Sequence, residues 1–344
     1  HKHFKDTEIG EVLKIRDKLS HAAIKKYTAM KNSAGKDNRI RGLFQYYGAN
    51  RTGRWTSRNV QLQNLKRNDL DDLNFARQMV REGNIDTLML TYDDVGAVLS
   101  NLVRTAFIPE EDKWLIVSDF SAIEARIVAW FANESWRLDV FKTHGKIYEA
   151  SAAMMFNIPI ESVTKDLRTK GKIAELALGY QGSVGAMEKM GGSRMGFSQE
   201  DMQTIVKKWR AANRKIVKHW YDVQGVVEKV LHSKSHLRLP HLNFYMKGKN
   251  LIIQLPSGRE LVYIDAKYTG DNIIYYGMNQ TTKQWGVQDT YGGKLVENIV
   301  QAAARDVLTD AMVRVDKAGH KIIMHVHDEV VVESKEDVSD EITQ

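Results

Sequence analysis

The chain of 344 residues contains no cysteine and only four prolines. The lack of cysteine excludes a disulfide-bonded scaffold, a zinc or iron–sulfur site with cysteine ligands, and catalysis by a thiol. No apolar run approaches the roughly 20 residues that span a bilayer, and no signal-peptide pattern is present. We therefore expect a protein of the reducing cytoplasm that has no membrane partner.

Hydrophobic residues make up 43% of the chain and charged residues 27%, a composition that excludes wholesale disorder. The length exceeds that of one ordinary domain, so we expect two or three packed units or one large discontinuous unit. The formal net charge of +7 permits a polyanionic partner. Because the chain starts at His1 without a methionine and ends in a charged run at Gln344, we expect a fragment of a longer protein.

Hydrophobic periodicity and turn signals predict an α+β chain in which a helical subdomain is inserted into a sheet-based one. The run Trp114–Val117 is rich in β-forming apolar residues and ends at Ser118–Asp119, which indicates a buried strand. The Gly191–Gly192 pair interrupts a long helical pattern. The expected elements are a helix over 11–30, helical pieces over 69–104, a strand over 114–119, a helix over 121–130, helices over 140–230, β-rich runs over 231–291, a helix over 295–315 and a hairpin over 322–332.

Two carboxylates stand at the ends of expected strands. Asp119 ends the strand over 114–119, and Asp328 lies at the bend of the hairpin, next to Glu329. An acidic residue in so apolar a run costs free energy unless it is paired or holds a cation. Carboxylates from two strands suit a pair of Mg²⁺ ions, which take a few hard oxygen ligands from the protein and the rest from water and substrate phosphates. The alternative is that Asp119 is a helix-capping or turn residue and that Asp328 only marks a hairpin tip.

Glu124 has a simpler local interpretation. Ser121 and Glu124 stand three positions apart at the start of an expected helix, which is the spacing of a capping box. In a capping box the serine side chain accepts a hydrogen bond from the backbone of the first turn, and the glutamate reaches back to the serine amide. The spacing alone therefore predicts that Ser121 and Glu124 cap this helix.

A stripe of four residues, Arg168, Lys172, Leu176 and Tyr180, recurs every four positions in a predicted helix. Successive members advance roughly 40° around the helix axis and about 6 Å along it, so they form one slowly winding stripe. Two cations at the positive end of the helix dipole suit a triphosphate, and the aromatic ring at the far end suits a base. A solvated basic turn followed by a core tyrosine is the competing interpretation.

A polar segment over 51–64 lacks apolar periodicity and is rich in arginine and amide side chains. Such side chains suit contacts to phosphates and to minor-groove acceptors, which every base pair offers. An ordinary surface loop is the competing interpretation. A second polar face lies on the apolar helix over 295–315, where buried amides need partners. The two sets are Arg54, Gln61, Gln63 and Asn64 in the segment, and Asn298, Gln301 and Arg305 on the helix.

Taken in their order along the chain, these motifs resemble the polymerase domain of family A DNA polymerases, the bacterial DNA polymerase I type, and most closely its phage and prophage members. The resemblance covers nearly the whole chain. The matching segments are 52–57 with 61–64 for primer–template contact, 118–126 for motif A, 168–180 for motif B, 297–306 for the palm helix with a template-contacting glutamine, and 327–329 for motif C.

The resemblance implies a role for each matching residue, with Glu124 as a steric gate that excludes a 2′-OH. The metal ligands would be Asp119, Asp328 and the carbonyl of Phe120, holding two Mg²⁺ ions for which Mn²⁺ is a substitute. Lys172 and Glu329 would complete the catalytic set. The residues in contact with the dNTP would be Arg168, Lys172, Leu176, Tyr180, Glu124 and Tyr148. The residues in contact with primer–template DNA would be Arg54, Gln61, Gln63, Asn64, Asn298, Gln301 and His327.

The resemblance also implies a right-hand fold, in which helical fingers are inserted into an antiparallel palm sheet and the thumb is truncated. The implied parts are a thumb remnant over 1–35, a first palm part over 36–125, fingers over 126–290 with an O helix over about 164–181 and a β-rich excursion, and a second, C-terminally truncated palm part over 291–344. No acidic exonuclease pattern precedes the motifs, so we expect no proofreading. The implied setting is phage DNA replication in the host cytoplasm by a monomer, with primer–template DNA and dNTPs as partners.

The sequence departs from the family pattern at three positions. Leu176 stands where better-known members carry Phe or Tyr, Tyr148 replaces a phosphate-binding His, and Gln181 replaces the glycine after the motif B tyrosine. The usual inferences about dideoxynucleotide discrimination and about that phosphate contact therefore do not transfer to this chain.

Three other functions remain open at this point. A single-subunit RNA polymerase shares much of the motif logic, although Glu124 argues against it because ribonucleotide enzymes need room for the 2′-OH. A metal-dependent phosphohydrolase would use His325, His327 and Asp328. A truncated domain would bind primer–template DNA without extending it.

Overall fold

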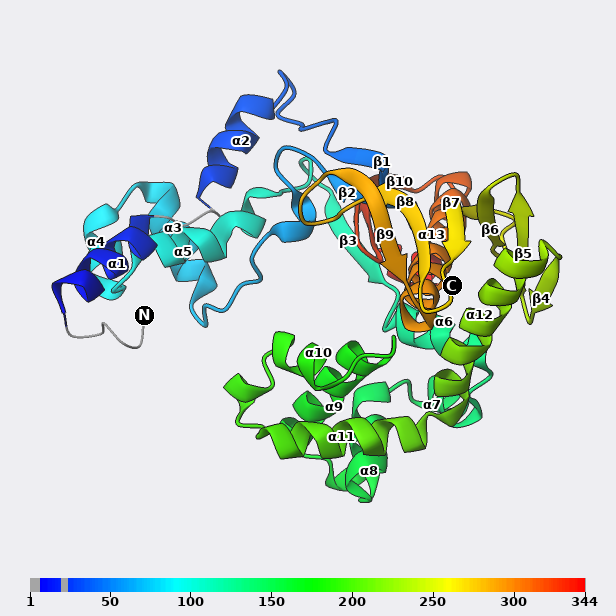
Figure 1. Ribbon diagram of the computed structural model, residues 1–344. Helices are drawn as coiled ribbons and strands as arrows, with labels where there is room; N and C mark the ends of the chain where they lie inside the picture. The colour runs from blue at the N-terminus through cyan, green and yellow to red at the C-terminus, as the bar shows by residue number, and fades with distance from the viewer. Residues whose placement is uncertain (1–6, 20–23, 344) are drawn as a thin grey trace. The chain divides into compact units, whose positions relative to one another are not determined.

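The computed structural model describes residues 7–19 and 24–343, which fold into two compact units (Figure 1). The first unit contains the described residues up to Ala49, then 55–119 and 312–344 except Gln344, and the second contains 50–54 and 120–311. Each unit is discontinuous in sequence, as expected for an insertion of one subdomain into another. Helices and antiparallel sheets occur together, so the expected α+β class is confirmed.

The first unit is built from short helices and two small sheets. Its elements are α1 (Glu8–Leu19), α2 (Lys25–Ser33), β1 (Phe44–Ala49), the 3₁₀ helix η2 (Leu62–Asn64), α3 (Leu73–Glu82), α4 (Ile85–Thr91), α5 (Val95–Leu102), β3 (Trp114–Asp119), β10 (Lys321–Val326), β11 (Glu329–Ser334) and α14 (Ser339–Thr343). Strand β2 (Arg54–Ser57) pairs with β1. The helix expected over 11–30 corresponds to α1 and α2, and its residues 20–23 lie outside the described residues.

Strands β10, β11 and β3 form an antiparallel sheet in that order, with Glu329 opposite Asp119 and Val332 opposite Ile116. Strand β3 is therefore an edge strand, and the prediction that it is buried is wrong. Trp114 and Val117 are 67% and 57% exposed. An apolar run specifies a strand, but it does not specify how many neighbours cover that strand.

The second unit holds the main hydrophobic core. Its helices are α6 (Ile123–Ala132), α7 (Ser135–Thr143), α8 (Ile147–Phe156), α9 (Lys165–Leu178), α10 (Val184–Lys189), α11 (Gln199–Ala212) and α12 (Arg214–Ser233), and α13 (Gly292–Lys317) runs from this unit into the first. Trp209 and Trp220 lie at the core with parallel rings 6.1 Å apart, and each is almost fully buried. Helix α11 starts with a capping box formed by Ser198 and Asp201.

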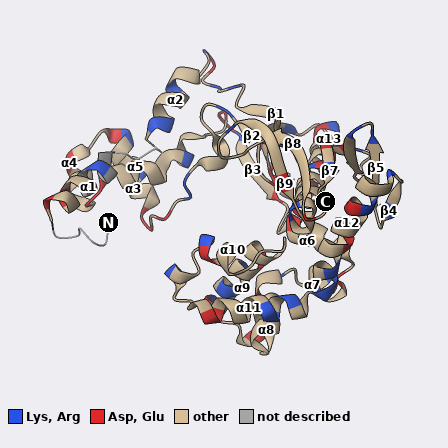
Figure 2. Ribbon diagram, viewed as in Figure 1, with Lys and Arg blue, Asp and Glu red and all other residues tan. Residues whose placement is uncertain are grey.

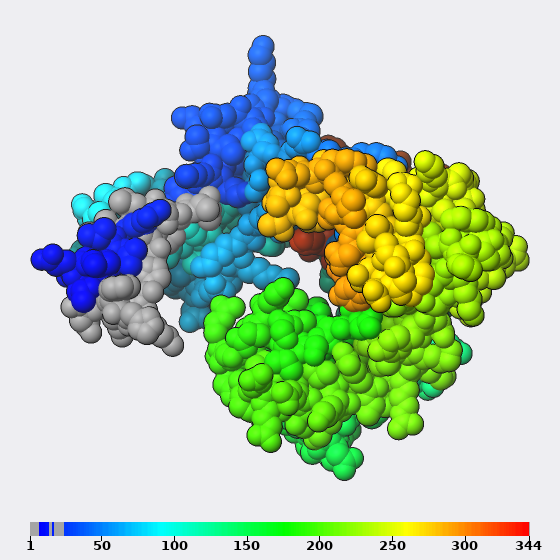
Figure 3. Space-filling view, in the orientation of Figure 1, coloured from blue at the N-terminus to red at the C-terminus, as the bar shows by residue number. Residues whose placement is uncertain are grey.

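Six antiparallel strands in sequence order complete the second unit. They are β4 (Leu237–Leu239), β5 (Leu242–Lys247), β6 (Asn250–Gln254), β7 (Glu260–Tyr268), β8 (Ile273–Met278) and β9 (Trp285–Thr290). Inward side chains such as Phe244, Leu251 and Tyr263 join the same core as α12. Figure 3 shows these strands, from yellow-green to orange, as one continuous surface. The β-rich character expected for 231–291 is confirmed.

Lysine and arginine residues are interspersed with aspartate and glutamate along both units (Figure 2). None of the helices over the described ranges is both long and apolar enough to cross a membrane.

Candidate active site

The acidic end of the three-stranded sheet brings the two predicted metal-binding aspartates together. Asp119 is the last residue of β3, and Asp328 lies in the two-residue turn between β10 and β11. Glu329 begins β11 directly opposite Asp119. Burial raises the pKa of the Asp119 carboxyl, and the charge and hydrogen bond of Asp328 raise it further. Burial likewise raises the pKa of Glu329, with Asp119 and Asp328 adding to the effect and Arg104 opposing it.

The turn that carries Asp328 contains an unusual backbone conformation. His327 has φ = 54°, a left-handed value that a non-glycine residue rarely adopts. Such a conformation costs about 1–3 kcal/mol and persists where surrounding structure enforces it, as it commonly does at functional sites. The pairing of Val326 with Glu329 enforces it here by closing the hairpin across two residues.

The donor set of this acidic end fits a divalent cation. A positive ion between the two carboxylates would relieve the repulsion that helps to raise the pKa of Asp119, and hard oxygen donors suit Mg²⁺. The Phe120 carbonyl accepts a hydrogen bond from the Ile123 amide and keeps a second lone pair. Across residues 7–19 and 24–343, no cluster of three or more histidine, aspartate and glutamate side chains is arranged to hold a metal ion.

His325, which the phosphohydrolase hypothesis used as a ligand, is part of the packing instead. Its ring stacks on Phe44 at 4.4 Å and meets the edge of Trp55 at 4.8 Å, and the residue is 7% exposed. Burial lowers the pKa of His325 to about 4. The imidazole therefore acts as a neutral core ring near neutral pH.

Glu124 lies in the second unit between an arginine and a tyrosine. Arg54 Nη1 donates to Glu124 Oε1 at 2.9 Å, and the Tyr180 hydroxyl donates to Oε2 at 3.0 Å. Both carboxylate oxygens are thus held by side chains from distant parts of the sequence. Burial raises the pKa of Tyr180 well above its ordinary value, and the charge of Glu124 reinforces the shift.

The capping box predicted for Ser121 and Glu124 is wrong. Helix α6 begins at Ile123, and its N-cap is Ala122, which has φ = 52° and makes no side-chain cap. The left-handed residue turns the chain between Ser121 and the helix, so the serine cannot reach the first-turn amides. The Ser121 carbonyl accepts a hydrogen bond from Arg126 Nε instead.

Helix α9 presents three of the four stripe residues on one exposed face, and the fourth, Tyr180, lies half-buried beyond the end of the helix. Arg168, Lys172 and Leu176 are exposed, with Leu176 at 51%, while the residues on the opposite side of the helix are buried. Arg168 Nε donates to Glu149 Oε1 at 2.7 Å, and its guanidinium lies 5.5 Å from the ring centre of Tyr148. The structure therefore brings Arg168 and Tyr148, two of the predicted dNTP-contacting residues, together.

Gln181, the departure that follows the stripe, has a structural role of its own. The helix ends at Leu178, Tyr180 follows it, and Gln181 adopts φ = 64°. Gln181 Oε1 accepts a hydrogen bond from the Gly293 amide at 2.8 Å. A glutamine here thus satisfies an amide of the first turn of α13, which a glycine could not do.

The predicted DNA-contacting residues differ in the hydrogen bonds that they make within the protein. Gln63 is tied to β2, since its carboxamide accepts from the Ser57 amide and donates to the Trp55 carbonyl. Gln61 accepts from Lys26 Nζ at 3.2 Å and from the Asn64 carboxamide at 3.5 Å, all on exposed side chains.

On α13, Asn298 is buried and donates to the Tyr263 hydroxyl at 3.0 Å. Gln301 donates to Glu297 Oε1 at 3.3 Å, and Arg305 is buried with its Nε bound to the Gly53 carbonyl. The sequence motifs did not indicate a role for Glu297. Burial raises the pKa of the Glu297 carboxyl, and the charge of Glu124 raises it further. The one signal in the sequence was its place four residues before Gln301 on a helix.

Comparisons with known proteins also indicate a family A DNA polymerase. A family model described as DNA polymerase family A matches residues 5–344. The chain is 51% identical over 337 residues to the DNA polymerase of Bacillus phage SP02, covering 95% of this chain and 52% of that protein. It is 23% identical over 248 residues to DNA polymerase I of Pseudomonas aeruginosa, covering 70% of this chain and 23% of that protein.

Among solved structures, the chain is similar to the POL domain of Pol1 from M. smegmatis in complex with DNA primer-template and dNTP. The TM-score is 0.59 at 20% sequence identity, over 92% of this chain and 45% of that chain, so the likeness supports the fold. The chain spans about half the length of the phage relative and about a quarter of the bacterial one.

Proposed function

The chain belongs to DNA polymerase family A, and on that premise we propose that it adds dNTPs to a primer 3′-OH under the direction of a DNA template. The observation that carries the proposal is the meeting of Asp119 and Asp328 at one end of the sheet formed by β10, β11 and β3. Polymerases of this family are metal-dependent, and these two carboxylates are the donors that a metal-dependent nucleotidyl transfer requires.

Asp119, Asp328 and the Phe120 carbonyl would hold two Mg²⁺ ions, with Mn²⁺ as a substitute. When bound, such ions supply a lowered pKa for the primer 3′-OH and neutralise the charge that develops on the transferring and leaving phosphates. Glu329 lies opposite Asp119 and supports the same acidic end of the sheet. The strained His327 turn keeps Asp328 at the tip of the hairpin, where its half-exposed carboxylate would reach a metal ion, and His327 itself would contact the primer terminus.

The exposed stripe of α9 would bind the incoming dNTP. Arg168 lies in the first turn of the helix, where the helix dipole adds to its attraction for phosphate, and Lys172 follows one turn later on the same face. Lys172 would donate a proton toward the leaving pyrophosphate. Leu176 and Tyr180 would lie on the base side, and Tyr148 would remain beside Arg168 at the phosphate side.

Glu124 would select deoxyribonucleotides. Its carboxylate is fixed by Arg54 and Tyr180, so it cannot swing away from a sugar that carries a 2′-OH. A rigid carboxylate rejects the extra hydroxyl both by its volume and by desolvation of its charge.

Primer–template DNA would lie along the remaining polar residues, which the resemblance assigns to the primer terminus and the minor groove. Amide and arginine side chains suit acceptors on every base pair and phosphates on either strand. The proposed set is Arg54, Gln61, Gln63, Asn64, Asn298, Gln301 and His327.

The wider setting is proposed on the same premise. The parts would be a thumb remnant over 1–35, palm over 36–125 and 291–344, and fingers over 126–290 with α9 as the O helix. The protein would act as a monomer in phage DNA replication, in the cytoplasm of the host.

Extension of a 5′-labelled DNA primer on a longer template tests the proposal. We expect extension with dNTPs in Mg²⁺ or Mn²⁺ and none in chelator, with rNTPs used far more slowly. Efficient rNTP use would favour a single-subunit RNA polymerase. Binding of the primer–template without any extension would instead identify a binding domain and contradict the proposed activity.

A further inference from the structure

A buried ion pair lies beneath α9, on the side opposite the exposed stripe. Arg137 on α7 and Glu175 on α9 are 38 positions apart in the sequence, and their side chains are 1% and 3% exposed. Charged side chains this deeply buried need hydrogen-bond partners, because each loses several kcal/mol of hydration. Within the described residues the pair meets this need except at Arg137 Nε.

The Glu175 carboxylate receives donors from three other helices. Its Oε1 accepts from Arg137 Nη1 at 3.0 Å, from Ser151 Oγ on α8 at 2.7 Å and from Trp209 Nε1 on α11 at 2.8 Å. Its Oε2 accepts from Arg137 Nη2, which makes the ion pair bidentate. One side chain of α9 is thereby joined to α7, α8 and α11.

The network continues into the junction between α11 and α12. Arg137 Nη1 also donates to Asn213 Oδ1 at 3.0 Å, and Asn213 Nδ2 donates to the Trp209 carbonyl at 2.8 Å. Figure 1 shows α7, α8, α9 and α11 gathered in the second unit. A buried ion pair of this kind adds little stability over an apolar replacement, so its distinctive contribution is a single geometry.

A close backbone contact fixes α9 one turn earlier. A Cβ on Gly171 would stand 2.2 Å from the Tyr148 carbonyl oxygen, so α8 and α9 approach each other as only glycine allows. Gly171 and Glu175 are four positions apart and lie on one side of the helix. Glu175 also lies three positions from Lys172, roughly 60° around the axis, at the border of the exposed stripe.

We propose that Glu175 is a positioning residue for nucleotide binding: its buried network fixes the rotation of α9 about its own axis and so directs the side chains of the exposed stripe. Gly171 sets the distance between α8 and α9, and Glu175 sets the angle. A small rotation of α9 would move Arg168, Lys172 and Leu176 together, since they project from one rigid helix. The proposal rests on the proposed function, because it takes the stripe as the dNTP-binding face.

The test separates positioning from stability. Glu175→Gln alone would leave Arg137 buried without a counter-charge, so the informative variant is the double change Arg137→Met with Glu175→Gln. It removes both charges and keeps an acceptor for Ser151 and Trp209, so it should be more stable than Glu175→Gln alone. We expect its KM for dNTPs to rise by about tenfold to 100-fold, because a displacement on the order of 1 Å has that effect.

Asp166→Asn is the matched control, since Asp166 lies on the same helix and its exposed carboxylate pairs with Lys170. The control should leave the KM for dNTPs and the affinity for primer–template DNA unchanged. A stable double variant with a wild-type KM would overturn the proposal. If the double variant fails to fold, Ser151→Ala removes one donor to Glu175 and keeps the ion pair. A raised KM for dNTPs in Ser151→Ala would then support the proposal, and a wild-type KM would overturn it.

Hydrogen exchange of the α9 amides supplies a readout that does not depend on catalysis. We expect faster exchange over 172–178 in the double variant than in the wild type, and no change in the core of α13. If the wild type fails to extend a primer while this difference is present, the proposed function is wrong and the positioning role of Glu175 stands. Unchanged exchange together with unchanged KM refutes the positioning role alone.

Discussion

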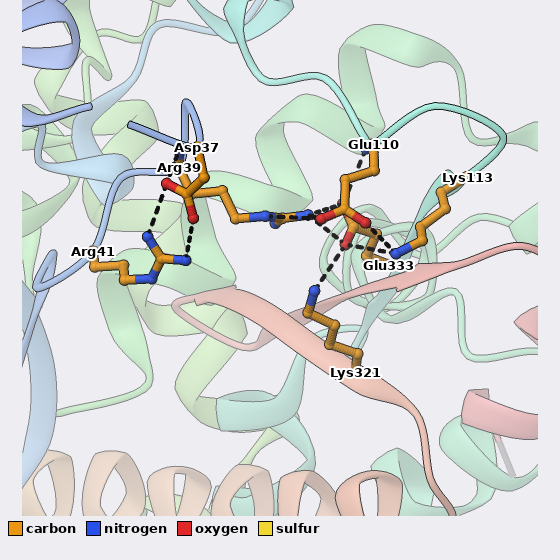
Figure 4. Close-up of polar contacts among 7 residues, drawn as sticks. All are labelled: Asp37, Arg39, Arg41, Glu110, Lys113, Lys321 and Glu333. Atoms are coloured by element: carbon orange, nitrogen blue, oxygen red, sulfur yellow. Dashed lines mark hydrogen bonds and ion pairs between the residues drawn. The ribbon is translucent and has the colours of Figure 1, made fainter. Parts of the chain in front are cut away.

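Replacement of Glu333 by glutamine should weaken the sheet that carries the two aspartates. Figure 4 shows the Glu333 carboxylate among Arg39, Lys113 and Lys321. The Glu333 side chain is 1% exposed and accepts from Arg39 Nη2 at 2.7 and 2.9 Å and from Lys321 Nζ at 3.2 Å. The Glu110 amide donates to the same carboxylate at 3.2 Å. Strand β11 thus ends in a buried carboxylate that several donors satisfy.

The size of the effect follows from the exposure of the partners. Breaking a fully buried pair costs about 3–5 kcal/mol, but water reaches the cations at Glu333 and compensates in part, so we expect about 2–3 kcal/mol. The three cations are exposed to 26%, 21% and 55% for Arg39, Lys113 and Lys321. In hydrogen exchange under native conditions, that loss corresponds to amides of β11 exchanging about 30- to 150-fold faster.

Glu110→Gln is the matched control, because Glu110 bonds to the same Arg39 and to Lys113 but its side chain is 47% exposed. Water screens such a pair, so the exchange of β11 should change far less than in Glu333→Gln. Equal effects from the two substitutions would refute the reasoning, since burial would then have no part in the strength of the cluster.

Acidification supplies a second check on Glu333. Burial by itself would raise the pKa of Glu333, but hydrogen bonds from Arg39, the Glu110 amide and Lys321 hold it below its ordinary 4.5. A carboxyl with a depressed folded-state pKa stabilises the protein above about pH 4.5 and loses that contribution as the pH falls through the folded value. The stability gap between wild type and Glu333→Gln should therefore be complete at pH 6 and should shrink below pH 4.5.

Three further predictions concern the second unit. Burial lowers the pKa of His219 from 6.5 to about 4, so the neutral ring stabilises the fold above pH 6.5 and this stabilisation is lost toward pH 4. Between pH 7 and pH 5 the wild type should therefore lose about 2 kcal/mol of unfolding free energy through this group. His219→Phe should abolish that loss, as measured by urea unfolding at the two pH values. Gly171→Ala should lower thermal stability by about 1–3 kcal/mol because its Cβ meets the Tyr148 carbonyl, whereas Gly185→Ala, with nothing within 4 Å, should be neutral or stabilising. Glu124→Ala should raise rNTP incorporation relative to dNTP incorporation in primer extension, and an unchanged ratio would remove Glu124 from the selection of the sugar.

Features that depend on local sequence were predictable. The turn at His327 and Asp328 follows from apolar runs on both sides of a short polar pair, and β10 and β11 confirm it. The placement of Arg168, Lys172 and Leu176 on one face of α9 follows from their spacing of four, whereas Tyr180, expected on the same helix, lies beyond its end at Leu178. In each case the information lies within a few residues of the feature.

Features that depend on distant residues or on a single backbone angle were not predictable. The capping box failed because Ala122 adopts a left-handed conformation that the spacing of Ser121 and Glu124 does not reveal. The hydrogen bonds of Glu124 come from residues 70 and 56 positions away, and those of Glu175 from residues 38, 24 and 34 positions away. No periodicity in one segment encodes such partners, because the fold alone brings them together.

The most direct test of the central claim is primer extension by Asp119→Ala and Asp328→Ala beside the wild type, with binding to primer–template DNA followed by fluorescence anisotropy. If the two aspartates are the metal-binding pair of a nucleotidyl transfer site, each variant should lose extension while its affinity for primer–template DNA stays close to that of the wild type. Extension by either variant at the wild-type rate would contradict the account.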